Sequence, residues 1–197
     1  MSDDKFCHKR GWLSQAGYSL TEMMIVVGVS AVVMGISVVT ISSSRSGLTG
    51  DGAMRVVLAQ MNQARELAIT QRRNMRLTFV GANAMQIIRE EVPGPTLTTI
   101  QSVSFEGRMN FLLVPSLPDT PEAYGNSAAT YFGAATEIKF TPDGTLVDQN
   151  GALLNGSVFL ALNTTQNQSL SARAVTIFGS TGRVRAYRWN GTVWKVV

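Results

Sequence analysis

The apolar residues of this chain are concentrated in one long segment near the N-terminus. No charged residue occurs between Met23 and Ser44, and residues 23–41 read MMIVVGVSAVVMGISVVTI, a run of 19 positions interrupted only by Gly, Ser and Thr. A helix needs about 20 such residues to cross a hydrocarbon core roughly 30 Å thick. The run therefore predicts one membrane-spanning segment or one export signal.

A helical pattern resumes after this run. Apolar residues at offsets of three and four form one stripe, made of Met54, Val57, Leu58, Met61, Ala64, Leu67 and Ala68. Such a stripe is typical of a helix that packs on a core. Gly47, Gly50 and Gly52 precede it, and each costs about 1 kcal/mol relative to Ala in a helix interior. We expect one long helix, loosened at these glycines, with a soluble part over about 54–73.

From Met75 onward the pattern changes to the alternation of β-strands. The first two extended segments flank a Gly81-Ala82-Asn83 turn, which predicts a hairpin. Residues 115–135 are rich in Pro, Gly and Ser and predict a long loop or insertion. The predicted strands are 75–80, 84–89, 96–105, 137–141, 145–148, 157–162, 172–178, 183–189 and 192–197.

The order of these elements, helix first and strands afterwards, predicts an α+β fold. We expect a long N-terminal helix whose first half spans the membrane and whose second half packs on an antiparallel β-sheet domain. The expected parts are a leader over 1–17, a transmembrane assembly helix over 18–44, its soluble half over 45–74 and a β domain over 75–197.

Composition and motifs exclude several classes of protein. With 197 residues, 45% of them hydrophobic and 15% charged, the chain has ample apolar material for a core. Cys7 and His8 are the only residues of their types, so we expect neither a disulfide within the chain nor a metal site. Without a later histidine, no His-assisted serine or cysteine mechanism is available. We expect no catalytic residue and no cofactor, and therefore not an enzyme.

The positive charge gathers at the C-terminus. Residues 173–197 contain four Arg and one Lys but no acidic residue, against a formal net charge of +4 for the whole chain. On the predicted strand 183–189, Arg183, Arg185, Tyr187 and Trp189 share one face, while Arg188 lies on the other. Arginines beside aromatic rings suit nucleic acid, because guanidiniums bind phosphates and rings stack on bases. The alternative is a solvated strand face, or an arginine contact with an acidic neighbouring subunit.

The residues before the apolar run carry the most specific signal. A polar leader with Lys5, Lys9 and Arg10 is followed by Gly17-Tyr18-Ser19-Leu20-Thr21-Glu22, and the apolar run begins directly after Glu22. An ordinary secretory signal has its cleavage site after the apolar region instead. This junction resembles the class III signal of type IV pilins and of the pseudopilins of type II secretion. Tyr18 stands where that family usually has Phe, and it is still aromatic.

The resemblance implies a processing site and an assembly residue. In that family a membrane aspartic peptidase, the prepilin peptidase, cuts after the glycine on the cytoplasmic side, and the new terminal amine is N-methylated. Here this implies cleavage between Gly17 and Tyr18, N-methylation of Tyr18 and a mature chain of 180 residues after removal of 17. Glu22 becomes the fifth mature residue, where the family has the glutamate that pairs with the terminal amine of a neighbouring subunit.

The same resemblance implies partners and a location. The partners are other pilins or pseudopilins, the prepilin peptidase and the inner membrane, with the N-terminus cytoplasmic and the C-terminal domain periplasmic. The cations of the leader agree with a cytoplasmic start. Two alternatives remain open: a plain signal peptide cut near residues 42–44, or a plain single-span anchor. Neither explains the spacing from Gly17 to Glu22.

Two later segments resemble the GspH/FimT group of minor pilins and pseudopilins. These are the turn Phe140-Thr141-Pro142-Asp143-Gly144 with Thr145, and Gly179-Ser180-Thr181-Gly182-Arg183-Val184-Arg185 near the C-terminus. The resemblance implies a structural subunit of a type II secretion pseudopilus or a type IV pilus. The alternative is a FimT-like minor pilin that binds DNA during natural transformation, with Arg183, Arg185, Tyr187, Arg188 and Trp189 as the candidate DNA-binding residues.

Overall fold

The computed structural model describes residues 17–94, 96–164 and 168–197, and within these it leaves out the side chains of 37–44. The leader residues singled out above, among them Cys7 and His8, lie outside this description. The chain divides into two compact units, residues 1–40 and residues 41–197. Each unit is described by itself.

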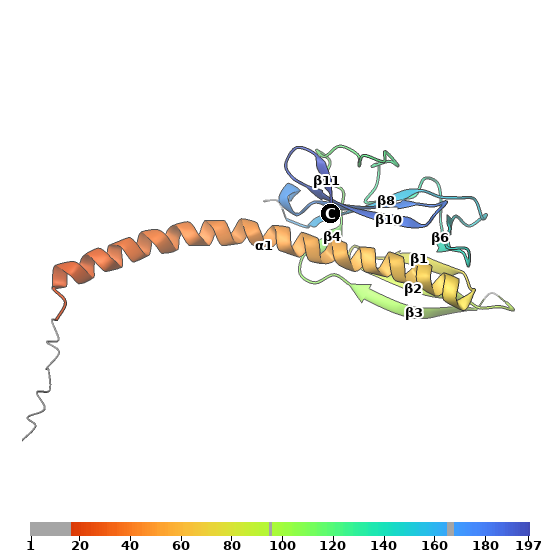
Figure 1. Cartoon of the computed structure of the whole chain (residues 1–197), viewed down its shortest axis with the longest axis horizontal. Coiled ribbons are helices and arrows are strands. Elements are labelled where there is room, and N and C mark those ends of the chain that lie inside the picture. The colour runs from red at the N-terminus through yellow and green to blue at the C-terminus, as the bar shows by residue number, and fades with distance from the viewer. Residues whose placement is uncertain (1–16, 95, 165–167) are drawn as a thin grey trace, which may run out of the picture. The chain divides into compact units, whose positions relative to one another are not determined.

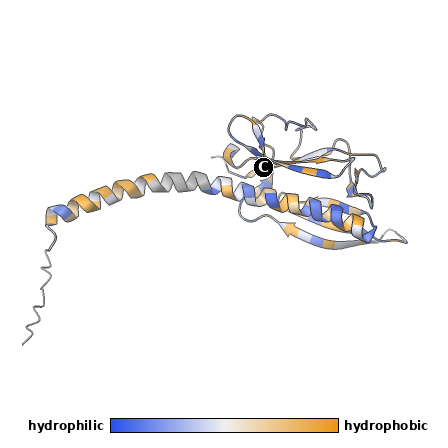
Figure 2. Cartoon of the chain, viewed as in Figure 1, coloured by the Kyte–Doolittle hydropathy of each residue, from blue (hydrophilic) through white to orange (hydrophobic). Residues whose placement is uncertain are grey.

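One helix, α1 (Leu20–Gln71), accounts for both helical segments of the sequence (Figure 1). It continues without a break through Gly47, Gly50 and Gly52, which confirms the expectation of one long helix. The loosening expected at these glycines stays a prediction, and Gly50 also has a spatial role, which is described below. Its described residues before position 37 are mostly apolar, whereas its later part alternates between apolar and polar residues (Figure 2).

The apolar stripe of α1 is buried as its spacing predicts. Val57, Met61, Ala64 and Ala68 have no exposed surface, and Met54 retains only 1%. The other two members of the stripe, Leu58 and Leu67, are partly buried against the same cluster. Complete burial of a side chain such as Met61 contributes about 1.5–3 kcal/mol, so this stripe holds the second part of α1 on the β domain.

The strands form two antiparallel sheets rather than one. The first has the order β3-β2-β1-β6-β7. Its hairpin pairs Val80 with Ala84 around the predicted turn. Its strands are β1 (Met75–Val80), β2 (Ala84–Glu90), β3 (Leu97–Ser104), β6 (Ile138–Phe140) and β7 (Leu146–Val147).

The second sheet contains the C-terminal strands in the order β11-β10-β9-β8-β4, and β5 pairs with β8 beside this path. Its strands are β4 (Met109–Phe111), β5 (Thr130–Tyr131), β8 (Gly156–Leu162), β9 (Arg173–Phe178), β10 (Arg183–Trp189) and β11 (Trp194–Val196), and a 3-10 helix η1 (Ser169–Ser171) precedes β9. The short strands β4 and β5 were not predicted, and β5 lies inside the segment interpreted as a loop.

Two apolar cores hold these layers together. The helix core joins the stripe of α1 to both sheets and includes Phe140, Ile87, Val175 and Ile177. In Figure 1, β3 runs below this part of α1, β8 and β10 run above it, and β1 and β2 overlap it in this view. The outer core lies on the opposite face of the second sheet, where residues 112–117 pack on Phe159, Tyr187, Trp189 and Trp194.

A buried arginine connects α1 to the second sheet. The side chain of Arg173, on β9, is completely buried, and its Nε donates a hydrogen bond to Asp51 Oδ1 at 2.6 Å. Its Nη2 donates to the carbonyl of Gly47 at 2.8 Å, and its Nη1 donates to the carbonyls of Leu170 and Ala172 at 3.1 and 2.8 Å. A buried guanidinium is tolerated only when it is paired in this way, so these bonds set the position of the helix on the sheet.

The close contact at this point explains Gly50. A Cβ atom at position 50 would lie 2.6 Å from the carbonyl oxygen of Ser171 and 3.2 Å from Cζ of Arg173. Because the first of these atoms belongs to the backbone, the helix cannot approach the sheet this closely with a larger residue. A Cβ atom at position 52, two residues later, would have no such neighbour within 4 Å.

The two turns that resemble the GspH/FimT group are in direct contact with each other. A Cβ on Gly182 would lie 2.1 Å from the carbonyl oxygen of Gly144, and both glycines have positive φ angles, +62° and +78°. That carbonyl also accepts a hydrogen bond from Nε of Arg65 on α1 at 3.1 Å. The backbone N–H of Leu146 donates to the carbonyl of Gly179 at 2.8 Å. Two turns that are distant in sequence therefore contact each other beside the side chain of Arg65.

The two helix glycines give a paired test of the α1–sheet contact. We expect Gly52→Ala to raise the free energy of unfolding by up to about 1 kcal/mol, because Ala is the better helix former at an open position. Gly50→Ala should lower it by about 1–3 kcal/mol, because the new methyl group meets the Ser171 carbonyl. Chemical unfolding of the detergent-solubilised full chain, followed by near-UV circular dichroism, measures both. Equal effects of the two substitutions would contradict the close approach.

Candidate functional site

The predicted processing junction lies immediately before α1. Gly17 and Tyr18 are outside the helix, and Tyr18 is 77% exposed. A Cβ on Gly17 would meet nothing within 4 Å, so the segment is accessible to another molecule. The helix begins as Met23 N–H donates to the carbonyl of Ser19 at 3.1 Å. The geometry is compatible with cleavage at this bond, which stays a prediction.

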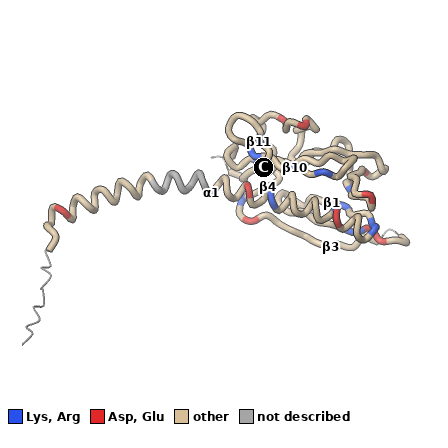
Figure 3. Tube along the Cα trace, in the orientation of Figure 1, with Lys and Arg blue, Asp and Glu red and all other residues tan. Residues whose placement is uncertain are grey.

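Glu22 occupies the first turn of α1 and is exposed. A carboxylate is favoured at a helix N-terminus because the unpaired N–H groups carry partial positive charge there. Up to position 36, Glu22 is the only charged residue that the structure describes in α1 (Figure 3). Its role in subunit pairing stays a prediction.

The residues after Glu22 expose an unusual amount of apolar surface. Large side chains from Met23 to Ile36 are between 53% and 68% exposed, among them Met24, Ile25 and Met34. Exposed apolar surface of this extent normally marks a surface that another molecule covers.

In the part of the chain that the structure describes, no helix combines the length and the apolarity needed to cross a bilayer.

The candidate DNA-binding strand β10 has the two faces that its alternation predicts, but they differ in accessibility. Arg183, Arg185 and Arg188 are exposed, whereas Tyr187 is 1% and Trp189 is 9% exposed. Both rings belong to the outer core beneath residues 112–117. The expectation that these rings are available to stack on bases is therefore wrong, while phosphate contacts by the arginines are untested.

An acidic residue from the predicted insertion contacts this strand. The hydroxyl of Tyr187 donates a short hydrogen bond to Glu122, and Nη1 of Arg185 lies 3.2 Å from the same carboxylate oxygen. Burial, together with the hydrogen bond to Glu122, raises the pKa of the Tyr187 hydroxyl above its ordinary value. Nε1 of Trp194 donates to the carbonyl of Pro118 at 2.8 Å. These contacts attach the insertion to the sheet and partly neutralise Arg185.

The arginines of residues 173–197 have different surroundings and different acidic partners. Arg173 is buried against α1, and Arg185 is paired with Glu122. Arg188 lies on the helix face of the second sheet, opposite Lys195 of β11 in the strand register. Its Nη1 is 3.7 Å from Asp51 Oδ2. Sequence reasoning placed these residues in one basic segment but gave no sign of Glu122 or Asp51 as their partners, because both are distant in sequence.

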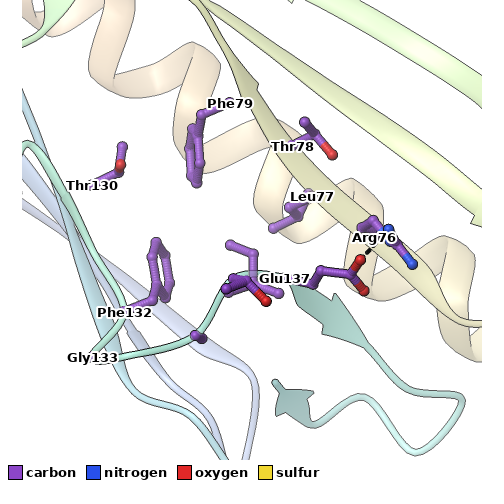
Figure 4. A pocket seen from close by; sticks show the side chains of 11 residues that line it. Arg76, Leu77, Thr78, Phe79, Thr130, Phe132, Gly133 and Glu137 are labelled. Carbon is purple, nitrogen blue, oxygen red and sulfur yellow. Dashed lines mark hydrogen bonds and ion pairs between the residues drawn. The ribbon is translucent and has the colours of Figure 1, made fainter. Parts of the chain in front are cut away.

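A groove of about 420 Å³ beside β1 is a candidate small-ligand site on the first sheet (Figure 4). Phe79 and Phe132 stack across it with ring centroids 6.0 Å apart. Its charged residues, Arg76 and Glu137, form an ion pair at 2.7 Å. Because each charge satisfies the other, the groove offers no free acid or base.

Near this groove, the carboxylate of Glu90 on β2 is held by hydrogen bonds and neighbouring cations. Partial burial of Glu90 would raise its pKa, but hydrogen bonds from Asn74 and Arg76 and the charge of Lys139 outweigh burial and lower that pKa. Within the described ranges, no three His, Cys, Asp or Glu residues are grouped so that they could hold a metal ion.

Comparison with known proteins supports the reading of the N-terminal junction. Residues 12–38 match the family described as "Prokaryotic N-terminal methylation motif". The match includes Gly17, Tyr18 and Glu22 and extends through the first part of the apolar run. A search among curated proteins found no match.

Two crystal structures of one protein are similar to this chain. Both are of the type IV minor pilin FimU of Pseudomonas aeruginosa, strain PAO1, in space groups P21 and P65. The first is 16% identical, with a TM-score of 0.45 over 68% of this chain and 84% of that one. The second is 15% identical, with a TM-score of 0.46 over 75% of this chain and 96% of that one.

The N-terminal residues, the family match and the fold agree with one another. Gly17, Tyr18 and Glu22 keep the spacing of the motif directly before the exposed apolar part of α1. The second part of the same helix packs on an antiparallel β domain, as the α+β prediction requires. The chain thus combines a match to an N-terminal methylation motif with a long helix whose second part packs on an antiparallel β domain.

Proposed function

We propose that this chain is a minor pilin or pseudopilin of the GspH/FimT type, a structural subunit of a type IV pilus or a type II secretion pseudopilus. Prepilin peptidase cleaves it between Gly17 and Tyr18, and the new amine of Tyr18 is methylated. The observation that carries the proposal is the methylation motif over residues 12–38, which includes the exposed apolar helix from Met23 to Ile36.

The apolar surface of α1 must be kept out of water both before and after assembly. Each large side chain between Met23 and Ile36 that is shielded from water contributes about 1.5–3 kcal/mol. A bundle of such helices provides this shielding once the subunit has left the bilayer, whereas a single chain outside the bilayer leaves the surface exposed. The proposed partners are therefore other pilins or pseudopilins that contribute the same kind of helix.

Glu22 supplies specificity to this apolar contact. A carboxylate buried in a helix bundle is costly unless a positive group pairs with it. The terminal amine of Tyr18 in a neighbouring subunit is such a group, and only one axial stagger of two helices brings the two together. Glu22 therefore sets the register of subunits that apolar packing alone would leave free to slide.

Before assembly, we propose, the run of residues 23–41 anchors the chain in the inner membrane, with the leader in the cytoplasm and the β domain in the periplasm. The support is the uncharged sequence from Met23 to Ser44 together with the cations of the leader. A subunit stored in the membrane keeps its apolar helix out of water until a filament accepts it.

Processing is tested by the intact mass of the membrane form. We expect a chain of 180 residues that begins at Tyr18 and carries one added methyl group. Gly17→Leu should leave the full leader in place, because the side chain obstructs the peptidase site, whereas Gly28→Ala within α1 should be processed normally. A wild-type chain that retains residues 1–17, or one that starts near Ser44, would refute this step.

Assembly is tested separately by Glu22→Gln. We expect this variant to be cleaved and stable but largely absent from sheared filaments, because its amide no longer attracts the amine of a neighbour. Glu66→Gln removes an exposed acid from the same helix and serves as the matched control. Immunoblots of the sheared and membrane fractions measure the distribution. Normal incorporation of Glu22→Gln would rule out the register role.

A second candidate function, DNA binding within such a filament, rests on Arg183. This residue begins β10, is exposed and, in the described part of the chain, has no acidic partner. Arg185 is 43% exposed despite its contact with Glu122. Since Tyr187 and Trp189 are buried, binding of this kind would depend on phosphate contacts and fall steeply with salt.

Retention of the full chain on immobilised duplex DNA at low salt tests this second candidate. If it is right, Arg183→Gln with Arg185→Gln abolishes retention, because both phosphate contacts are lost. Arg55→Gln with Arg108→Gln removes the same charge from exposed positions elsewhere and should retain most binding. Unchanged retention of the first double variant would exclude DNA binding by this strand.

A further inference from the structure

A cationic groove lies where α1 meets the C-terminal strands. It encloses about 740 Å³ and is lined by Gly47, Leu48, Asp51, Leu170, Arg188, Trp189, Asn190 and Lys195. All of these residues belong to the unit formed by residues 41–197. Its lining includes no residue of the proposed processing site or of the first sheet.

The groove contains more positive than negative charge. Arg188 and Lys195 are directly opposite each other on paired strands, and like charges in such a position repel. Asp51 is the one acidic side chain in the lining, and its closer bond, at 2.6 Å, goes to the buried Arg173. Arg188 is 3.7 Å from Asp51 and 54% exposed. One carboxylate is therefore shared among cations that it cannot fully neutralise.

The wall of the groove is apolar and exposed. Leu48 is 70% exposed and Leu170 is 44% exposed, and both line the groove together with the cations. Arg45 is also exposed and lies three residues before Leu48 on α1. Cations beside exposed aliphatic side chains are the combination that binds the surface of an anionic bilayer, where phosphates lie next to the upper acyl chains.

The groove is also close along the chain to the end of the apolar run. Ile41, the last residue of that run, precedes Leu48 by seven residues of continuous helix. If the run is anchored as in the proposed function, on which this inference rests, the groove residues of α1 follow the membrane anchor within a few residues along the chain.

We propose that this groove binds the phosphate groups of anionic phospholipids while the subunit waits in the membrane. Arg188 and Lys195 contact the phosphate, and Leu48 and Leu170 contact the adjoining glycerol and acyl region. The contact holds the β domain against the bilayer and is given up when the subunit enters a filament. An acidic surface of a neighbouring subunit is the competing occupant.

A fluorescent probe in the groove tests this proposal. The full chain carries Cys7→Ser, which removes the only cysteine, and Leu170→Cys labelled with an environment-sensitive dye. It is reconstituted into vesicles of phosphatidylcholine alone or of phosphatidylcholine with phosphatidylglycerol. We expect a shift of the emission to shorter wavelength only with phosphatidylglycerol, lost in Arg188→Gln with Lys195→Gln and reduced by salt. Arg55→Gln with Arg108→Gln should keep the shift.

Two outcomes would overturn the proposal. One is the same emission in both kinds of vesicle. The other is a shift that follows the ratio of protein to lipid instead of the phosphatidylglycerol content, since this would assign the groove to a neighbouring subunit. Flotation of the labelled chain with both kinds of vesicle reports membrane anchoring independently. A chain that fails to float with either contradicts the anchoring part of the proposed function, whereas a floating chain without a lipid-dependent shift contradicts the groove alone.

Discussion

The contact between Arg173 and Asp51 determines how the second part of α1 is placed on the second sheet. Apolar packing of the α1 stripe is strong but has little direction, because Val57, Met61 and Ala64 could accept several offsets along a sheet. The guanidinium of Arg173 has fixed donors, and its bonds to Asp51 and to the carbonyl of Gly47 are satisfied at one offset only. Loss of that offset would leave a fully buried charge unpaired, which costs several kcal/mol. Gly50 permits the close approach that these bonds require.

Local patterns predicted most of the fold because most of its elements are defined locally. The stripe of α1 and the hairpins around Gly81 and Gly182 follow from periodicity and turn residues within a few positions of each other. The division into two sheets did not follow, since it depends on which strands meet across the helix. The short strand β4 was missed because three residues carry too little alternation to recognise. The close approach at Gly50 was missed because its partner, Ser171, is 121 positions away.

The candidate sites also differ in whether they are defined by neighbouring residues or by residues distant in sequence. The junction from Gly17 to Glu22 is a contiguous motif, so the sequence alone suggested it and the match to residues 12–38 agrees. The C-terminal arginines are also contiguous, but their chemistry depends on distant residues. Glu122 approaches Arg185 and Tyr187 from the insertion, and burial beneath residues 112–117 removes Tyr187 and Trp189 from solvent. A sequence can place charges on one strand, but the layers packed on that strand decide which of them reach a ligand.

The proposed membrane contact must not prevent the proposed assembly, because both involve α1. Assembly requires the part of α1 around Glu22 to leave lipid for a bundle of helices, where a carboxylate gains a partner and apolar side chains exchange one apolar surrounding for another. That exchange releases little hydrophobic energy, since acyl chains are as apolar as the helices. Weak, reversible contacts at the headgroups are therefore compatible with assembly, whereas a deep lipid site would oppose it. The groove beside Arg188 and Lys195 fits this condition, because it is open to solvent and its charges are held by few bonds of their own.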